Sequence, residues 1–417
     1  MSFEPLSNRL LLNDWMTAGV FLLGAISLSV PSGYSYATVI LVLGSIVYLV
    51  RNGVGTLSWE SKLLGASMLL YAVYWMTESS LRGAELRAWD APSRFLFALL
   101  VLLAFSSGAS VRLWGVWIGI AIGALSAALL ASWQFFIQDF SRVTGFVGAD
   151  HFGSLAIILG LLSLLGFIWA VAAKQSWPFA GVCLLGAVAG SYAALLSGTR
   201  ASWGAAVLVA FLLIFVFVRC LPGKRTPALI GGGLVAIGVI SLAFDTVTAG
   251  RIMRLVSETK DYFGPGHVEG SISVRLDIWR AAFALFLEKP ILGWGEVAYG
   301  EQMIKGGEQG LLSRTVASVG SSHAHNQIID ALAKHGVIGA AVLMIVYLVP
   351  LLLFLRVLLQ SQGTNAVTLA AAGLTVVIVT FIYGLAHHPL GSHSGVVIYA
   401  YWVAILGGLV LRSEEAG

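Results

Sequence analysis

Long apolar runs separated by short polar segments recur along most of the chain. A helix needs about 20 apolar residues to cross a ~30 Å hydrocarbon core, and several of these runs reach that length. The pattern therefore predicts an all-α, polytopic integral membrane protein. We expect twelve transmembrane helices, at 15–30, 37–50, 63–77, 95–107, 115–135, 155–173, 178–197, 201–218, 228–246, 336–356, 366–385 and 394–411.

The apolar run from 178 to 218 is too long for a single span. As one continuous helix it would measure about 60 Å, roughly twice the hydrocarbon thickness. We therefore expect two helices here, with the break at Ser197-Gly198-Thr199-Arg200. The first apolar run follows the polar residues 1–14 and has no small-residue cleavage site. We therefore expect no cleaved signal peptide.

One long polar region, residues 247–335, separates the ninth and tenth expected spans. Apolar residues at helical spacing predict an amphipathic surface helix over 252–263, and a turn-rich stretch follows it. A second helix is expected over 275–288, ended by Pro290 and by Gly293-Trp294-Gly295. The chain thus divides into spans one to nine (1–246), a large loop (247–335) and spans ten to twelve (336–417).

The distribution of Lys and Arg predicts which side of the membrane each loop faces, because cytoplasmic loops carry an excess of both. With a cytoplasmic N-terminus, ten such residues fall on the inner side: Arg9, Arg51, Lys62, Arg112, Lys174, Arg219, Lys224, Arg225, Arg356 and Arg412. Five fall in the short outer loops: Arg82, Arg87, Arg94, Arg142 and Arg200. We therefore expect both termini in the cytoplasm and the 247–335 loop outside.

The composition agrees with a membrane protein and excludes some other classes. Hydrophobic residues make up 58% of the chain and charged residues 11%, whereas soluble domains have about 25% charged residues. The net charge of +4 is spread over short loops and does not indicate a nucleic-acid partner. Cys183 and Cys220 lie in or at the end of apolar runs, as buried thiols do, and predict neither a disulfide nor a metal pair.

The strongest polar constellation is Ser321-Ser322-His323-Ala324-His325-Asn326, which precedes a nine-residue helical stretch and Gly336. A glycine there allows the chain to bend before the tenth span, so His325 should lie at the outer rim of the membrane. A histidine has an ordinary pKa near 6.5 and can act as a general base there. The alternative is a hydrogen-bonded histidine at a helix start. No carboxylate or third ligand stands at a spacing typical of a metal site.

Two arginines are further candidates. Arg200 follows Ser197 and Thr199 at the break, and an arginine in a membrane segment is costly and is usually either functional or extended to the membrane surface, which is the alternative here. Arg275 shares a helix face with Trp279, one turn later, and a guanidinium suits bidentate binding of phosphate. The alternative for Arg275 is a surface ion pair with Asp277.

Three further histidines, His387, His388 and His393, lie in the loop between the last two spans. They could form a metal-binding tract, or they could line a polar cavity around the turn at Pro389. No phosphate-cradling glycine loop is present, which argues against an enzyme that uses a nucleotide.

Taken together, these motifs resemble those of bacterial O-antigen ligases, part of a group that includes O-antigen polymerases and protein O-oligosaccharyltransferases. The resemblance is carried by His325-Asn326 with Gly336 and Gly339, by Ser197–Arg200 before Trp203, and by Arg275 and Trp279 before Gly293-Trp294-Gly295. It covers residues 190–345 in motif detail. The remainder of the chain is similar only in span count and in the position of the large loop.

The resemblance implies transfer of O-antigen polysaccharide from undecaprenyl diphosphate to lipid A–core oligosaccharide, at the periplasmic face of the bacterial inner membrane. It implies inverting, metal-independent transfer without a cofactor, in which His325 is the base and Arg200 and Arg275 bind the donor diphosphate. His323 could share the role of the base, and Asn326, Ser197, Thr199 and Trp279 are possible supporting residues.

The alternatives to a ligase are a polymerase, a protein O-oligosaccharyltransferase and, from another class, a lipid or polysaccharide transporter. A transporter should carry ionisable residues near the middle of its spans. The expected spans are almost free of charge, which favours the enzyme.

Overall fold

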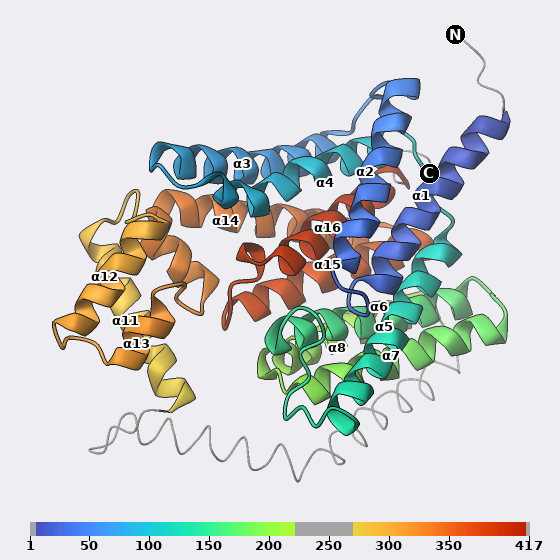
Figure 1. Cartoon of the computed structure of the whole chain (residues 1–417). Helices are drawn as coiled ribbons and strands as arrows, with labels where there is room; N and C mark the ends of the chain where they lie inside the picture. Colours follow the sequence, from blue (N-terminus) through green and yellow to red (C-terminus); the bar gives the residue numbers. More distant parts are fainter. Residues whose placement is uncertain (1–5, 222–269, 414–417) are drawn as a thin grey trace. The chain divides into compact units, whose positions relative to one another are not determined.

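The computed structural model describes residues 6–221 and 270–413, and this part of the chain consists of helices and their connections (Figure 1). The N-terminal part contains α1 (Leu6–Ile26), α2 (Gly33–Asn52), α3 (Trp59–Leu81), the 3-10 helix η1 (Leu86–Trp89), α4 (Asp90–Ser106), α5 (Leu113–Phe136), α6 (Ala149–Ala172), α7 (Trp177–Ser197) and α8 (Arg200–Cys220). The C-terminal part contains α11 (Ser271–Glu288), α12 (Glu296–Glu308), α13 (Arg314–Gly320), α14 (Gln327–Gln360), α15 (Thr364–Gly384), the 3-10 helix η2 (Pro389–Gly391) and α16 (His393–Ser413).

Eight helices in the described part are long and apolar enough to cross a membrane. They coincide with eight of the expected spans and confirm the prediction of an all-helical, multi-pass membrane protein. Shorter apolar helices over Leu11–Ile26 and Gly204–Cys220 match the spans expected at 15–30 and 201–218. The span expected at 63–77 falls within α3, and that at 228–246 lies outside the described residues, so the total of twelve stays a prediction.

The break predicted between the seventh and eighth spans is confirmed. Helix α7 ends at Ser197 and α8 begins at Arg200. Gly198 between them adopts the left-handed conformation, with φ 70° and ψ 21°, and its N–H donates to the Leu195 carbonyl oxygen. Glycine reaches this conformation without the steric cost that a Cβ brings, so the sequence ends the helix here.

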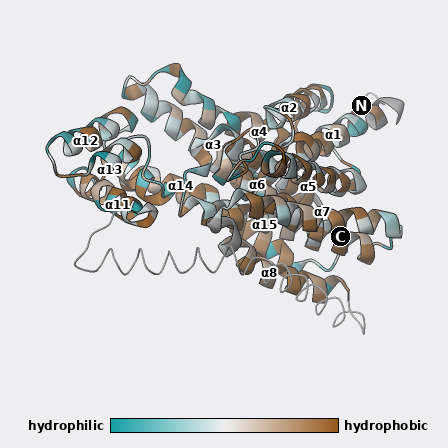
Figure 2. Cartoon of the chain, turned by 60° about the horizontal axis from the view of Figure 1, so that its bottom comes forward, coloured by the Kyte–Doolittle hydropathy of each residue, from teal (hydrophilic) through white to brown (hydrophobic). Residues whose placement is uncertain are grey.

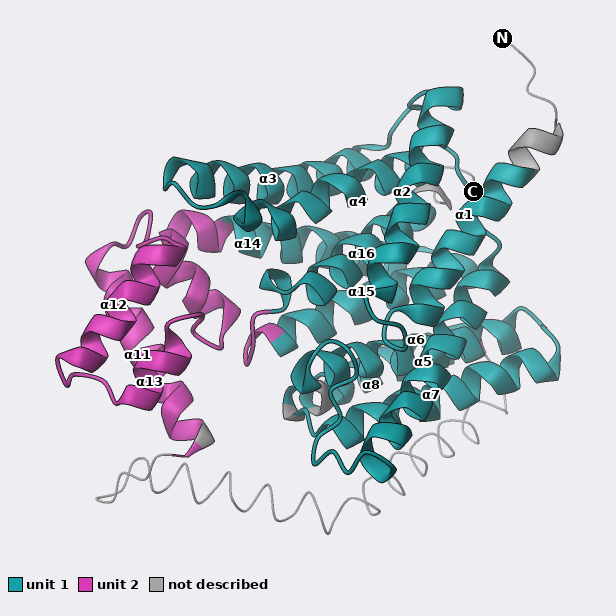
Figure 3. Cartoon of the chain, viewed as in Figure 1, with its two compact units in different colours: residues 1–220, 342–383, 389–417 teal, residues 221–341, 384–388 magenta. Residues whose placement is uncertain are grey.

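The chain forms two compact units (Figure 3). Unit 1 comprises Met1–Cys220, Val342–Tyr383 and Pro389–Gly417 and contains the apolar helices α1 to α8, the apolar part of α14 from Val342 on, α15 and α16 (Figure 2). Its helices pack closely where small residues meet: a Cβ on Gly190 of α7 would lie 2.6 Å from the Cα of Gly160 on α6. Small residues at such contacts let helix backbones approach closely, as is common within membranes.

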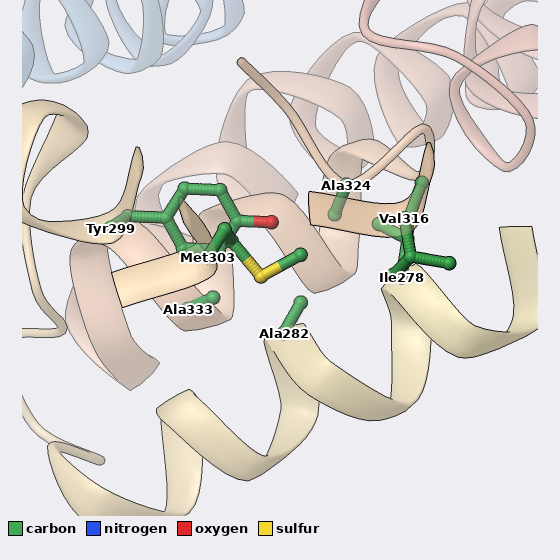
Figure 4. Close-up of a cluster of buried hydrophobic side chains, with 7 residues drawn as sticks. All are labelled: Ile278, Ala282, Tyr299, Met303, Val316, Ala324 and Ala333. Carbon is green, nitrogen blue, oxygen red and sulfur yellow. The ribbon is translucent and has the colours of Figure 1, made fainter. Parts of the chain in front are cut away.

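Unit 2 comprises Leu221–Ala341 and Gly384–His388. Its described part contains α11, which confirms the helix expected over 275–288 and begins four residues earlier. It also contains α12 and α13; short helices were expected in this loop, but the positions of these two were not predicted. The amphipathic helix expected over 252–263 lies outside the described residues. A buried cluster joins these elements (Figure 4): Ile278, Ala282, Tyr299, Met303, Val316, Ala324 and Ala333.

Candidate active site

Residues 290–295, which follow α11, form backbone hydrogen bonds with residues 333–337 of α14. The N–H groups of Trp294 and Gly295 donate to the carbonyl oxygens of Ala333 and Lys334, at 3.0 and 2.7 Å. In return, the Val337 N–H donates to the carbonyl oxygen of Pro290 at 2.8 Å. These bonds satisfy carbonyl groups that the end of a helix leaves without a partner. The two glycine-containing motifs therefore form one structural element.

Gly336 gives α14 its kink. Its φ of 64° and ψ of −166° interrupt the helix, as the sequence predicted, and separate residues 327–335 from the apolar span that follows. A Cβ on Gly336 would lie 2.2 Å from the carbonyl oxygen of Ile291. Only glycine combines this conformation with such a close backbone approach.

Asn326 begins the short helix and also ties two loops together. Its Oδ1 accepts hydrogen bonds from the backbone N–H groups of Ile328 and Ile329, at 3.0 and 3.2 Å, which is the arrangement of a helix N-cap. Its Nδ2 donates to the carbonyl oxygen of Leu385 at 3.1 Å. Asn326 thus fixes the helix start next to His325 and joins it to the loop that carries His387 and His388.

Four histidines from two segments gather in unit 2. The ring centroids of His323 and His325 are 4.1 Å apart, and those of His325 and His387 are 6.1 Å apart. The ring centroid of His388 lies 6.2 Å from that of His323. The backbone of His325 has a φ of 51°, a value that residues other than glycine seldom adopt. Such strained backbone is common at functional sites.

The loop histidines therefore divide between the two units. His387 and His388 join the cluster in unit 2, whereas His393 pairs with Asp90 in unit 1. In the described ranges, no group of three His, Cys, Asp or Glu side chains is arranged to hold a metal ion. Burial lowers the pKa of His388 below its ordinary value of 6.5, although the Asp330 carboxylate acts in the opposite direction.

A buried ion pair lies next to the histidine cluster. Asp330 and Lys334 are 2% and 1% exposed, and Lys334 Nζ lies 3.2 Å from Asp330 Oδ2. Lys334 Nζ also donates to Glu296 Oε2 and to the Ser322 carbonyl oxygen, both at 2.8 Å. Sequence reasoning missed all three charged residues. The spacing of Asp330 and Lys334 at i and i+4 was the available signal, but such pairs usually lie in solvent.

Arg275 and Trp279 are both partly buried on α11, whereas Arg280 is exposed. Ile278, three residues from Arg275 on the same helix, packs in the buried cluster that also contains Ala324. Ala324 is the residue between His323 and His325. The helix carrying Arg275 and the loop carrying His325 therefore adjoin a common core.

The hydroxyl groups at the break in unit 1 stabilise the break itself. Ser197 Oγ donates to the Ala194 carbonyl oxygen at 2.6 Å and lies 2.9 Å from Thr199 Oγ1. Thr199 Oγ1 in turn donates to the carbonyl oxygen of Ala149 at 3.1 Å. Arg200 is the first residue of α8. Ser197 and Thr199 thus connect the start of α8 to the start of α6.

Residues 185–344 match the family model described as O-antigen ligase. This part of the chain is similar to the O-antigen ligase family. The resemblance predicted from the sequence is thereby confirmed over that segment, which we term the O-antigen ligase segment. It includes Arg200, Arg275 and His325, whereas His387 and His388 lie beyond its end and join the site through the fold.

The similarity to known proteins extends beyond the O-antigen ligase segment. The chain is 25% identical over 377 residues to a protein of Haemophilus influenzae described as uncharacterized. The alignment covers 89% of this chain and 92% of that protein. This alignment therefore extends well beyond the O-antigen ligase segment.

Proposed function

We propose that this protein is an O-antigen ligase, which transfers O-antigen polysaccharide from undecaprenyl diphosphate to lipid A–core oligosaccharide. The proposal is supported by the match of residues 185–344 to the family and by the multi-pass helical fold. We place the reaction at the periplasmic face of the inner membrane, with both termini in the cytoplasm. Both lipid-anchored substrates can reach an enzyme in that membrane by lateral diffusion.

The observation that carries the proposal is the setting of His325. Its backbone is held in the left-handed region between Ala324, whose N–H is bonded to Asp330, and Asn326, which caps the following helix. A side chain held at both neighbours can keep one orientation toward a substrate. Such fixed geometry contributes to catalysis by orienting the reacting groups.

In the proposed reaction, His325 accepts the proton of an acceptor hydroxyl as its oxygen attacks the anomeric carbon of the donor glycan. The new glycosidic bond forms on the face opposite the bond to the diphosphate, and that bond breaks with its electron pair going to the diphosphate oxygen. The configuration at carbon is therefore inverted. His325 then loses its proton to solvent, and the undecaprenyl diphosphate departs. Polyprenyl diphosphate is an activated leaving group, so neither a nucleotide nor a metal ion is required by the proposal.

The two arginines would stabilise the charge that develops on the leaving diphosphate. Arg275 is partly buried next to the core that supports the His325 loop, which suits a cation near the reacting bond. Arg200 enters the proposal through the family motif at the start of α8. His323, whose ring is adjacent to that of His325, is the second candidate for the base.

The fold also bears on the alternative of a transporter. Among the residues whose side chains the structure describes, the buried carboxylate and ammonium groups are Asp330 and Lys334, and both belong to unit 2. The described spans of unit 1 bury no acidic or basic side chain of this kind. Such groups mark the substrate paths of many transporters, so the described spans support the enzyme over a transporter.

The test is glycan transfer by purified protein, with a defined undecaprenyl-diphosphate-linked donor and three acceptors: lipid A–core, a second lipid-linked glycan and a Ser/Thr peptide. We expect transfer to lipid A–core in the presence of a chelator. His325→Ala should reduce the rate at least about 100-fold, within the range attributed to general base catalysis. Glu301→Ala, at an exposed position of α12, is the matched control and should be as active as the unchanged protein.

Transfer to the glycan or to the peptide in place of lipid A–core would identify a polymerase or a protein glycosyltransferase and reject the ligase. Full activity of folded His325→Ala would reject His325 as the base. His323→Ala then decides between the two histidines. Loss of activity with chelator that a divalent cation restores would contradict the metal-independent mechanism.

A further inference from the structure

We propose that Asp330 is a positioning residue for the His325 loop, held in place by its buried ion pair with Lys334. The proposal rests on His325 as the proposed base and adds residues that neither the sequence motif nor the family resemblance assigned. Asp330 is not proposed to touch substrate. It acts through the backbone of the residue next to His325.

The burial of this pair needs an explanation. Removing a carboxylate and an ammonium from water costs more than their mutual attraction usually returns, so buried ion pairs are weak stabilisers. Here the side chains of Asp330 and Lys334 are 2% and 1% exposed. Fixing one particular local arrangement is a role that can offset such a cost.

Both charged groups bind the backbone of the loop that carries the histidines. Asp330 Oδ1 accepts a hydrogen bond from the Ala324 N–H at 2.7 Å. Lys334 Nζ donates to the Ser322 carbonyl oxygen at 2.8 Å. The two bonded residues lie on either side of His323, and Ala324 directly precedes His325. The pair therefore holds the loop at two points immediately before the strained residue.

The second oxygen of Asp330 extends the contact to the other histidine segment. Asp330 Oδ2 lies 3.7 Å from Nδ1 of His388 and 3.2 Å from Lys334 Nζ. Asn326 binds the same segment through Leu385, at 3.1 Å. One carboxylate thus adjoins both segments that contribute to the histidine cluster, which is the arrangement expected of a residue that sets their relative position.

Glu296 makes a decisive experiment possible. Its carboxylate lies 2.8 Å from Lys334 Nζ, so Lys334 keeps a partner when Asp330 is replaced by a neutral residue. Asp330→Asn retains an oxygen that can accept from the Ala324 N–H. Asp330→Ala and the apolar, similarly sized Asp330→Leu retain none. Comparing these variants separates the hydrogen bond to the loop from the charge.

The variants are purified, checked for folding by thermal unfolding, and assayed for kcat and KM with the same donor and lipid A–core acceptor. We expect kcat of Asp330→Ala to fall about 100-fold, since a displacement near 1 Å in a catalytic group can cost that much. The KM for donor should stay within about threefold, because only the base is displaced. Asp330→Asn should recover at least about tenfold of the lost kcat, and Glu301→Ala should match the unchanged protein.

A kcat equal to that of the unchanged protein in folded Asp330→Ala or Asp330→Leu would overturn the proposal. If only one of the two variants folds, its kcat is the deciding measurement. An Asp330→Asn variant as impaired as Asp330→Ala would also overturn it, because the hydrogen bond would then be irrelevant. The proposal would also be overturned if the measured fall in kcat were fully explained by a smaller fraction of folded protein in the variant. His325→Ala is assayed in parallel: if it is active, the proposed function fails, whereas an inactive His325→Ala with a fully active Asp330→Ala rejects this inference alone.

Discussion

His325 occupies a backbone conformation that costs a non-glycine residue about 1–2 kcal/mol, and its neighbours supply the bonds that hold it there. Asn326 caps the helix on one side, and Asp330 binds Ala324 on the other. Histidine visits this region more often than bulky side chains do. At the scale of single residues, the candidate site is thus a strained histidine fixed by short-range hydrogen bonds.

The proposed role of Arg275 depends on the shape of its guanidinium. Arg275→Lys keeps the charge but removes the planar pair of donors that fits a diphosphate. We expect kcat/KM for the donor to fall at least about tenfold, since one bidentate contact is lost. Arg280→Lys, at an exposed position of the same helix, should leave kcat/KM unchanged. Equal activity of Arg275→Lys and the unchanged protein would argue against bidentate binding.

Gly336 is the residue whose replacement should most disturb the site without touching a histidine. Gly336→Ala meets both an unfavourable φ of 64° and the Ile291 carbonyl oxygen 2.2 Å from the new Cβ. Gly310→Ala is the matched control, because it has a φ of 72° but open space around it. We expect Gly310→Ala to cost about 1 kcal/mol and Gly336→Ala clearly more. Thermal unfolding measures both, and equal losses would contradict the close packing at Gly336.

At the scale of elements, short polar helices in unit 2 are held by one core and by motif segments that bind each other. Trp294 shows both effects, since its backbone N–H donates to Ala333 and its indole Nε1 donates to the Leu285 carbonyl oxygen at the end of α11. The ammonium of Lys289 lies 3.6 Å from the centre of the Trp294 ring, a cation–π contact. The segment 290–295 therefore connects α11 to the helix that begins at Asn326.

The core of unit 2 can be tested at Met303, which is 1% exposed in the buried cluster. Met303→Ala removes most of the side chain and should cost about 2–5 kcal/mol through lost contacts and the cavity left behind. Met303→Leu nearly conserves volume and should cost less than about 1.5 kcal/mol. Thermal unfolding compares the two variants. Equal stabilities would indicate that the cluster does not support α11, α12 and α13.

At the scale of the whole molecule, the predicted orientation places α11, α12 and α13 outside and the connection between α14 and α15 inside. A single cysteine in place of Leu311, which is 76% exposed, should then react with a membrane-impermeant maleimide in intact cells with a permeable outer membrane. A single cysteine at Gln362, exposed between α14 and α15, should react only after the inner membrane is opened. Both are introduced after replacing Cys183 and Cys220. The opposite labelling would invert the topology.

The helical architecture could be predicted from the sequence because bilayer thickness fixes the length of apolar runs and glycine marks the breaks. The breaks at Gly198 and Gly336 and the helix over 275–288 were found this way. The positions of α12 and α13 were not, since these helices are short and their apolar residues face a small core. The histidine and arginine motifs were singled out by their resemblance to a known family, and their role stays a prediction.

The sequence by itself determined the multi-pass helical class, the two helix breaks and the similarity of residues 185–344 to the O-antigen ligase family. These features depend on the order of apolar residues, polar residues and glycines over short stretches of the chain. Only the tertiary structure brought His387 and His388 to His323 and His325, and buried the ion pair of Asp330 and Lys334 next to this cluster. The reason is physical: whether a charged pair is solvated or buried, and which loop it holds, depends on partners distant in sequence.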